Sequence, residues 1–114
     1  MQLTEDIYRT TRAFPNSETY ALASQLQRAA VSVPSNIAEG HARSSTKDFL
    51  RFLSIAMGSL AEIETQLELS ARLEYINEIK LGELLTTTNE LGRMLRGLRN
   101  SLSRKLVPSL APNS

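Results

Sequence analysis

The fold of this chain is decided by residues 25–67, which read QLQRAAVSVPSNIAEGHARSSTKDFLRFLSIAMGSLAEIETQL. The stretch predicts the end of one helix, a turn and most of a second helix. Before the turn, apolar residues recur at the three-to-four spacing of a single helix face: Leu22, Leu26, Ala29, Val33 and Ile37. This stripe stays in phase across Pro34, so we expect one kinked helix from Asn16 or Ser17 to about Ala42. The alternative is a break with a new cap at Ser35-Asn36.

The helix after the turn has the strongest pattern. Ser45 and Asp48 form a near capping box, so we expect the helix to begin there. Core spacing then continues along the following positions: Phe49, Phe52, Leu53, Ala56, Leu60, Ile63, Leu67 and Ala71. Apolar residues also lie on the far side of this helix, at Ile55, Leu69 and Leu73. A helix apolar over so much of its surface is covered on more than one side, and we expect a second copy of the chain to supply part of that cover.

One further helix is expected on each side of this pair. Apolar spacing predicts a short first helix from about Thr4 to Arg12, ended by Phe14-Pro15. Asn77 is a good cap for the last helix, whose stripe continues to Leu102 and which Pro108 should end. Four helices with short connections and no strand pattern predict an all-α, antiparallel up-and-down four-helix bundle. We expect one domain over residues 1–107 and a flexible tail over residues 108–114.

Composition limits the class of protein. The 114 residues include no Cys, which excludes disulfides, thiolate metal sites and cysteine nucleophiles. The first residues are acidic where a signal peptide needs a basic region, and no run of 18 apolar residues occurs. We therefore expect a cytoplasmic protein that does not enter a membrane.

Charge is distributed unevenly along the chain. From Leu91 onward there are five cations and no acid, a charge of +5, against eight cations and twelve acids before it, a charge of −4. This asymmetry permits an anionic partner, although cations at the end of a helix also occur as a solvated face that the macrodipole favours. The candidate contacts to RNA or DNA are Arg43, Lys47, Arg51, Arg93, Arg96, Arg99, Arg104 and Lys105. The chain has no Trp and its Phe residues are assigned to the core, so binding should be electrostatic and weakly specific.

A polar row interrupts the apolar faces of the two central helices. It comprises Asn36, Glu39, Ser59, Glu62 and Gln66. Because an unsatisfied buried polar group costs about 1–3 kcal/mol, we expect these residues to form a hydrogen-bond network between helices or between subunits. The enzymatic alternative pairs Glu39 with Glu62 as acid and base, but no nucleophile or metal set accompanies them.

No cofactor or metal site is predicted. A di-metal site of the ferritin-like kind needs two Glu-x-x-His motifs, and the chain has one His, His41, without that spacing. His41 is expected to be solvated or to cap the end of its helix, and Gly40 to serve the chain reversal.

The phrases SQLQRAAVSVPSNIAEG and SSTKDFLRFLSIAMGSLAEIETQL, with IYRTTRAFP before them and LEYI after them, resemble a bacterial four-helix bundle family. That family is named for proteins encoded in intervening sequences of large-subunit ribosomal RNA genes. The resemblance implies a cytosolic bundle that assembles into a homopentamer, in a family where most members have no established activity. A related branch is similar to the accessory variability protein of diversity-generating retroelements, a basic pentamer that associates with nucleic acid and a reverse transcriptase.

Two departures from the family pattern limit what carries over. Family members commonly have a further helix turn or two before IYRTTRAFP, and the net charge of +1 differs from the strongly basic retroelement branch. We therefore expect a non-enzymatic, homopentameric scaffold or accessory protein that binds RNA or DNA through its basic residues, without assigning it a reverse-transcriptase partner. The alternative is a protein-protein interaction module with no affinity for nucleic acid.

Overall fold

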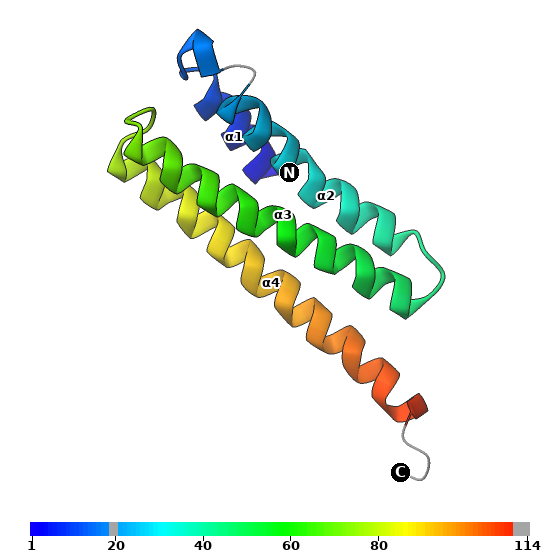
Figure 1. Cartoon of the computed structure of the whole chain (residues 1–114). Helices are drawn as coiled ribbons and strands as arrows, with labels where there is room; N and C mark the ends of the chain where they lie inside the picture. The colour runs from blue at the N-terminus through cyan, green and yellow to red at the C-terminus, as the bar shows by residue number, and fades with distance from the viewer. Residues whose placement is uncertain (19–20, 111–114) are drawn as a thin grey trace.

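The computed structural model describes residues 1–18 and 21–110 (Figure 1). Four α-helices and a short 3₁₀ helix account for most of them: α1 Gln2–Thr11, η1 Asn16–Glu18, α2 Leu22–His41, α3 Thr46–Arg72 and α4 Glu78–Leu110. Helices adjacent in sequence pack against each other, and α1 also contacts α4. The fold is the predicted all-α, up-and-down four-helix bundle, elongated to 59 Å along its longest axis.

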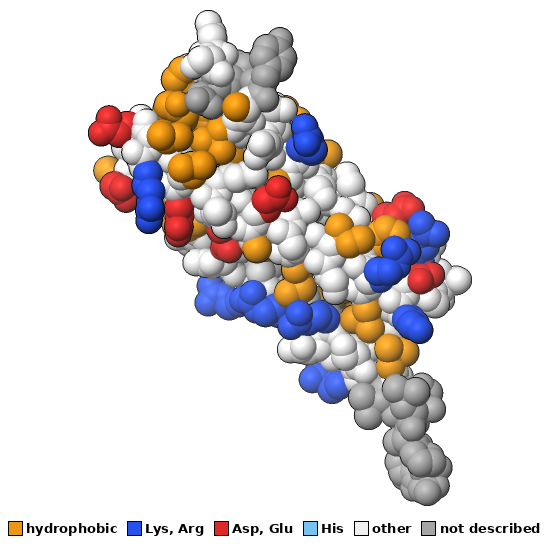
Figure 2. Space-filling view, in the orientation of Figure 1, with side chains coloured by type: hydrophobic (Ala, Val, Ile, Leu, Met, Phe, Trp, Pro, Cys, Tyr) orange, Lys and Arg blue, Asp and Glu red, His pale blue; other side chains and the backbone are white. Residues whose placement is uncertain are grey.

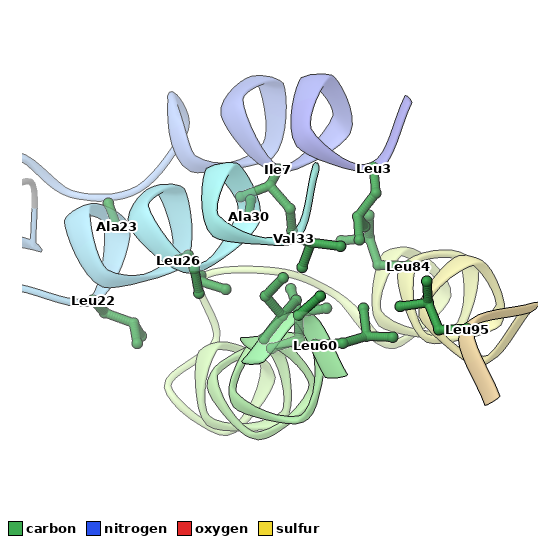
Figure 3. Packing of buried hydrophobic residues seen from close by; sticks show 14 of the residues in the cluster. Leu3, Ile7, Leu22, Ala23, Leu26, Ala30, Val33, Leu60, Leu84 and Leu95 are labelled. Atoms are coloured by element: carbon green, nitrogen blue, oxygen red, sulfur yellow. The ribbon is translucent and has the colours of Figure 1, made fainter. Parts of the chain in front are cut away.

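The core lies on the stripes that the sequence predicts. Leu26 and Val33 of α2 and Leu53 and Ile63 of α3 have no exposed surface. Figure 3 shows Ile7 of α1 pointing toward α2 and Leu3 of α1 lying beside Leu84 of α4, with Leu95 also entering from α4. Because α1 has only 10 residues, it covers only part of the length of α2 and leaves the C-terminal half of α4 without a facing fourth helix (Figure 1).

The prediction that α2 begins at Asn16 or Ser17 is wrong. Residues Asn16–Glu18 form the separate 3₁₀ turn η1, and α2 begins only at Leu22. Phe14, two residues before this turn, is buried and its ring lies 5.3 Å from that of Tyr75 in the α3–α4 connection. This long-range contact fixes the direction of the chain before α2 starts, which local capping signals do not show.

The prediction that α2 continues through Pro34 is confirmed. Pro34 has no N–H, so the carbonyl of Ala30 loses its partner within the helix. In the structure, the hydroxyl of Thr4 donates a hydrogen bond to that carbonyl at 2.9 Å. The first helix therefore supplies the donor that the proline removes from the second.

Side-chain caps begin the two long helices where the sequence predicts them. The N–H of Asp48 donates to Ser45 Oγ at 3.0 Å, and the N–H of Lys80 donates to Asn77 Oδ1 at 2.7 Å. Each bond satisfies one of the amides that a helix N-terminus leaves unpaired.

The prediction that Pro108 ends α4 is wrong, because the helix continues to Leu110. A proline removes one hydrogen bond, and in the last turn of a helix of 33 residues that loss does not reverse the direction of the chain. Residues 108–110 of the predicted flexible tail are thus helical, and residues 111–114 lie outside the described part of the chain.

Candidate nucleic-acid interface

Most of the predicted cations on α4 reach the surface. Arg93, Arg96, Arg104 and Lys105 are exposed, and Arg99 is half-buried. Figure 2 shows Lys and Arg side chains gathered along α4, with a second group near the α2–α3 turn on the same face. Within residues 1–18 and 21–110, none of the five takes part in an ion pair. Their positive charge is therefore not neutralised by the bundle itself.

The side chain of Arg96 lies back along its own helix. A Cβ atom on Gly92 would lie 3.2 Å from Arg96 Nη1, so the absence of a side chain at Gly92 makes room for the guanidinium. The same residues line a small pocket of about 120 Å³ between α3 and α4, where the hydroxyl of Thr88 donates to Glu64 Oε2 at 2.8 Å. Arg96 is held closer to the bundle than a freely solvated arginine would be.

The cations at the α2–α3 turn form the second group. Arg43, Lys47 and Arg51 are all exposed. The Cζ atoms of Arg43 and Arg51 lie 5.0 Å and 4.6 Å from the centroid of the Phe52 ring. Both distances fall within the range of cation–π attraction. We call the eight candidate cations, the five of α4 and these three, the basic surface.

The structure divides the predicted polar row into separate pairs. Ser59 Oγ lies 2.8 Å from Ser32 Oγ, and Asn36 Nδ2 donates to both the carbonyl and the hydroxyl of Ser32. Asn36 and Ser59 are therefore connected, but through a residue outside the predicted row. Ser32 could have been predicted as a partner of Asn36, since it precedes Asn36 by four residues on the same helix face.

Gln66 belongs to a second pair. Its Nε2 donates to Gln25 Oε1 at 3.3 Å, and its own Oε1 is buried and accepts no hydrogen bond within the described residues. Gln25 was not among the predicted residues. A buried amide oxygen without a donor is costly, and Gln66 Oε1 is such an acceptor where α3 meets α2.

The two glutamates proposed as an acid–base pair lie in different surroundings. Glu39 is exposed and accepts from Arg43 at 2.7 Å, whereas Glu62 lines a pocket of about 390 Å³ together with Gln25, Arg28 and Ser59. No cluster of His, Asp and Glu suited to a metal ion occurs among the described residues. The ring of His41 lies edge-on to Phe49 with centroids 5.9 Å apart.

Gly40 has a role different from the predicted one. It lies inside α2 and is buried, and a Cβ atom at this position would lie 2.9 Å from both Phe49 Cδ1 and Phe52 Cβ. Real Cβ atoms do not approach so closely. Gly40 therefore allows α2 to approach α3, and the chain reverses only after it, over residues 42–45.

None of the described helices is long and apolar enough to cross a membrane.

The chain is similar to known proteins in both sequence and structure. The model of the family described as 23S rRNA-intervening sequence protein matches residues 1–97. Among solved structures, the chain is similar to a protein of unknown function from the S23 ribosomal protein family of Bacteroides thetaiotaomicron. The two share 25% sequence identity over 86% of this chain and 92% of the other, with a TM-score of 0.80. Among proteins with curated descriptions, no match was found.

Proposed function

We propose, starting from the fact that the chain belongs to the 23S rRNA-intervening sequence protein family, that it is a non-enzymatic scaffold or accessory protein of the cytoplasm. It assembles with itself, as a pentamer, and binds RNA or DNA through the basic surface. The observation that carries this proposal is the uncompensated charge of α4. Five cations and no acid follow Leu91, and none of these cations is paired within the described residues.

The chemistry of the basic surface suits a phosphate backbone. Each Lys or Arg that neutralises a phosphate releases a counterion, so affinity comes from charge and falls as salt rises. Phosphate contacts position a protein on nucleic acid without reading its sequence. Of the described aromatic rings that could stack on bases, Phe14 is buried and Phe49, Phe52 and Tyr75 are half-buried, which supports binding with little sequence preference.

Self-assembly is supported by surface that the single chain does not cover. Ile55 and Leu69 of α3 and its C-cap residue Leu73 are 43%, 45% and 47% exposed, and Met94 of α4 is 70% exposed. A second copy would bury these apolar side chains.

The test is fluorescence anisotropy of labelled single- and double-stranded oligonucleotides, with the protein's assembly checked by light scattering. The variant Arg93→Glu/Arg104→Glu should bind more weakly than the control below, because it reverses two exposed cations of the basic surface. The control Arg12→Glu/Arg72→Glu makes the same change in net charge at exposed positions elsewhere. If both double variants lose affinity equally, binding depends on total charge and not on this surface. If the assembled wild-type protein does not bind at low salt, the nucleic-acid part of the proposal is wrong.

The second candidate function is a protein-protein interaction module. It is favoured by the exposed apolar side chains Met94 and Leu98 of α4. Assembly without any nucleic-acid binding would favour this candidate.

A further inference from the structure

The cations at the α2–α3 turn are held together by one aromatic ring. Arg43 comes from the end of α2 and Arg51 from the first part of α3, yet both guanidiniums lie within 5.0 Å of the Phe52 centroid. Two positive groups that share a ring repel each other, and attraction to the ring offsets this repulsion. The Phe52 ring therefore contacts fork-shaped donors from both α2 and α3.

The ring itself is fixed by helix packing. Phe52 is half-buried, and the close approach of α2 at Gly40 leaves no room for even a methyl group next to Phe52 Cβ. The guanidinium side remains open, since 44% of the Arg43 side chain is exposed. Attraction to the ring restricts the two guanidiniums, which reduces the entropy lost on binding.

One of the two guanidiniums, that of Arg43, already binds a carboxylate. Glu39 Oε1 accepts a hydrogen bond from Arg43 Nη2 at 2.7 Å. Within the described residues, Arg51 and Lys47 have no acid at ion-pair distance. Glu39 thus shows that Arg43 can donate to an oxyanion while remaining on the ring, and it would compete with any external anion for the same donors.

We propose that Arg43 and Arg51, positioned by Phe52, form a clamp on phosphate groups of the nucleic-acid backbone, with Glu39 as the internal competitor for Arg43. This inference rests on the proposed function, because it assigns phosphate contacts within the basic surface. Guanidinium groups suit the site because each presents parallel N–H donors to two phosphate oxygens. Since the Phe52 ring is occupied by the two arginines, the clamp contacts backbone and leaves the bases unread.

Charge-preserving variants test the clamp separately from the overall charge. Arg51→Lys keeps the charge but loses the paired donors and the stacking, and the matched control is Arg72→Lys near the other end of the same helix. We expect Arg51→Lys to weaken oligonucleotide binding about three- to tenfold, with an unchanged dependence on salt, and Arg72→Lys to have no effect. Anisotropy titrations of a labelled single strand of 20 nucleotides at low salt give both quantities.

Two more variants separate a positioning role from a merely structural one. Phe52→Leu removes the ring and should weaken binding to a similar extent. Glu39→Gln removes the competing charge and should tighten binding about two- to fivefold, an effect that loss of structure would not produce. If Phe52→Leu fails to fold, the variants Glu39→Gln and Arg51→Lys, which change exposed residues, still test the clamp.

The outcomes distinguish the clamp from the proposed function. If the wild-type protein binds and Arg51→Lys, Phe52→Leu and Glu39→Gln all bind as it does, the clamp is wrong and the basic surface stands. If the assembled wild-type protein does not bind at low salt, the proposed function fails and the clamp fails with it.

Discussion

Glu74 has the one positive φ among the described non-glycine residues, at 64°. It follows the C-cap of α3, and the bonds Tyr75 N–H to Ser70 O and Glu74 N–H to Ala71 O close the helix end in a Schellman motif. This position normally carries Gly, because a Cβ in the left-handed region costs about 1–2 kcal/mol. Glu74→Gly should therefore raise the free energy of unfolding by about 0.5–1 kcal/mol in urea titrations. Glu74→Ala keeps the Cβ and is the control; equal gains from both would show that strain is not the cause.

The hydroxyl pair of Ser32 and Ser59 tests whether the polar contacts stabilise the α2–α3 interface. Removing either hydroxyl leaves its half-buried partner with fewer bonds, so each single change to Ala should cost about 1 kcal/mol. The double change should cost less than the sum of the two, since no partner is then left unpaired. Additive losses in a double-mutant cycle would contradict a direct interaction between them.

At the scale of elements, α1 and α2 are joined by the bond between Thr4 and the carbonyl that Pro34 leaves free. Thr4→Val keeps the shape and removes the donor, and should lower the free energy of unfolding by about 1–2 kcal/mol. In a Pro34→Ala background the helix supplies its own N–H, so the same change should cost much less. Thermal and urea unfolding of the four proteins measure this coupling, and equal losses in both backgrounds would contradict it.

The contact between α2 and α3 depends on Gly40. Gly40→Ala should destabilise the protein by about 1–3 kcal/mol, because the new methyl group would overlap Phe49 and Phe52. The matched control is Gly97→Ala on the exposed face of α4, where nothing lies within 4 Å of the added carbon. That change should stabilise the helix by about 0.5–1 kcal/mol. If both variants were destabilised, the loss would come from replacing a glycine in a helix and not from the packing at Gly40.

These elements also show what could be predicted from the sequence. The start of α3 and most of the core follow from local spacing and capping as predicted, but Phe49 and Phe52 are half-buried and Leu98 is 36% exposed. The predicted start of α2 and the predicted end of α4 were wrong, although Asn16, Ser17 and Pro108 carry strong local signals. A tertiary contact overrides the signal at the start of α2, and the length of α4 overrides the signal of Pro108.

The candidate site was also predictable only in part. Spacing identified the exposed cations, but it assigned Phe52 wholly to the core and gave no sign that Arg43 and Arg51 share its ring. It also missed Ser32 and Gln25 as hydrogen-bond partners of the polar row. Such pairings depend on how two helices face each other across a turn, which periodicity along one helix does not specify.

At the scale of the whole molecule, the C-terminal half of α4 has two different flanks. Arg93, Arg96 and Arg104 lie on one side, and Met94 and Leu98 lie on the other, where α1 does not extend. We expect the apolar flank to contribute to self-assembly. Met94→Glu should therefore shift the mass in light scattering from about five times 12.7 kDa toward that of the single chain, while helical content stays unchanged. Asn100→Glu adds the same charge to the opposite side, and a loss of assembly in both would show that the flank is not specific.

Binding of nucleic acid through the basic surface is tested most directly by a salt titration of oligonucleotide binding by the assembled wild-type protein. Fluorescence anisotropy at several salt concentrations gives the slope of log affinity against log salt, which reports how many phosphates are neutralised. We expect clear binding at low salt, a steep negative slope, and a shallower slope for Arg93→Glu/Arg104→Glu than for Arg12→Glu/Arg72→Glu. Absence of binding at low salt, or the same slope for the two double variants, would contradict this expectation.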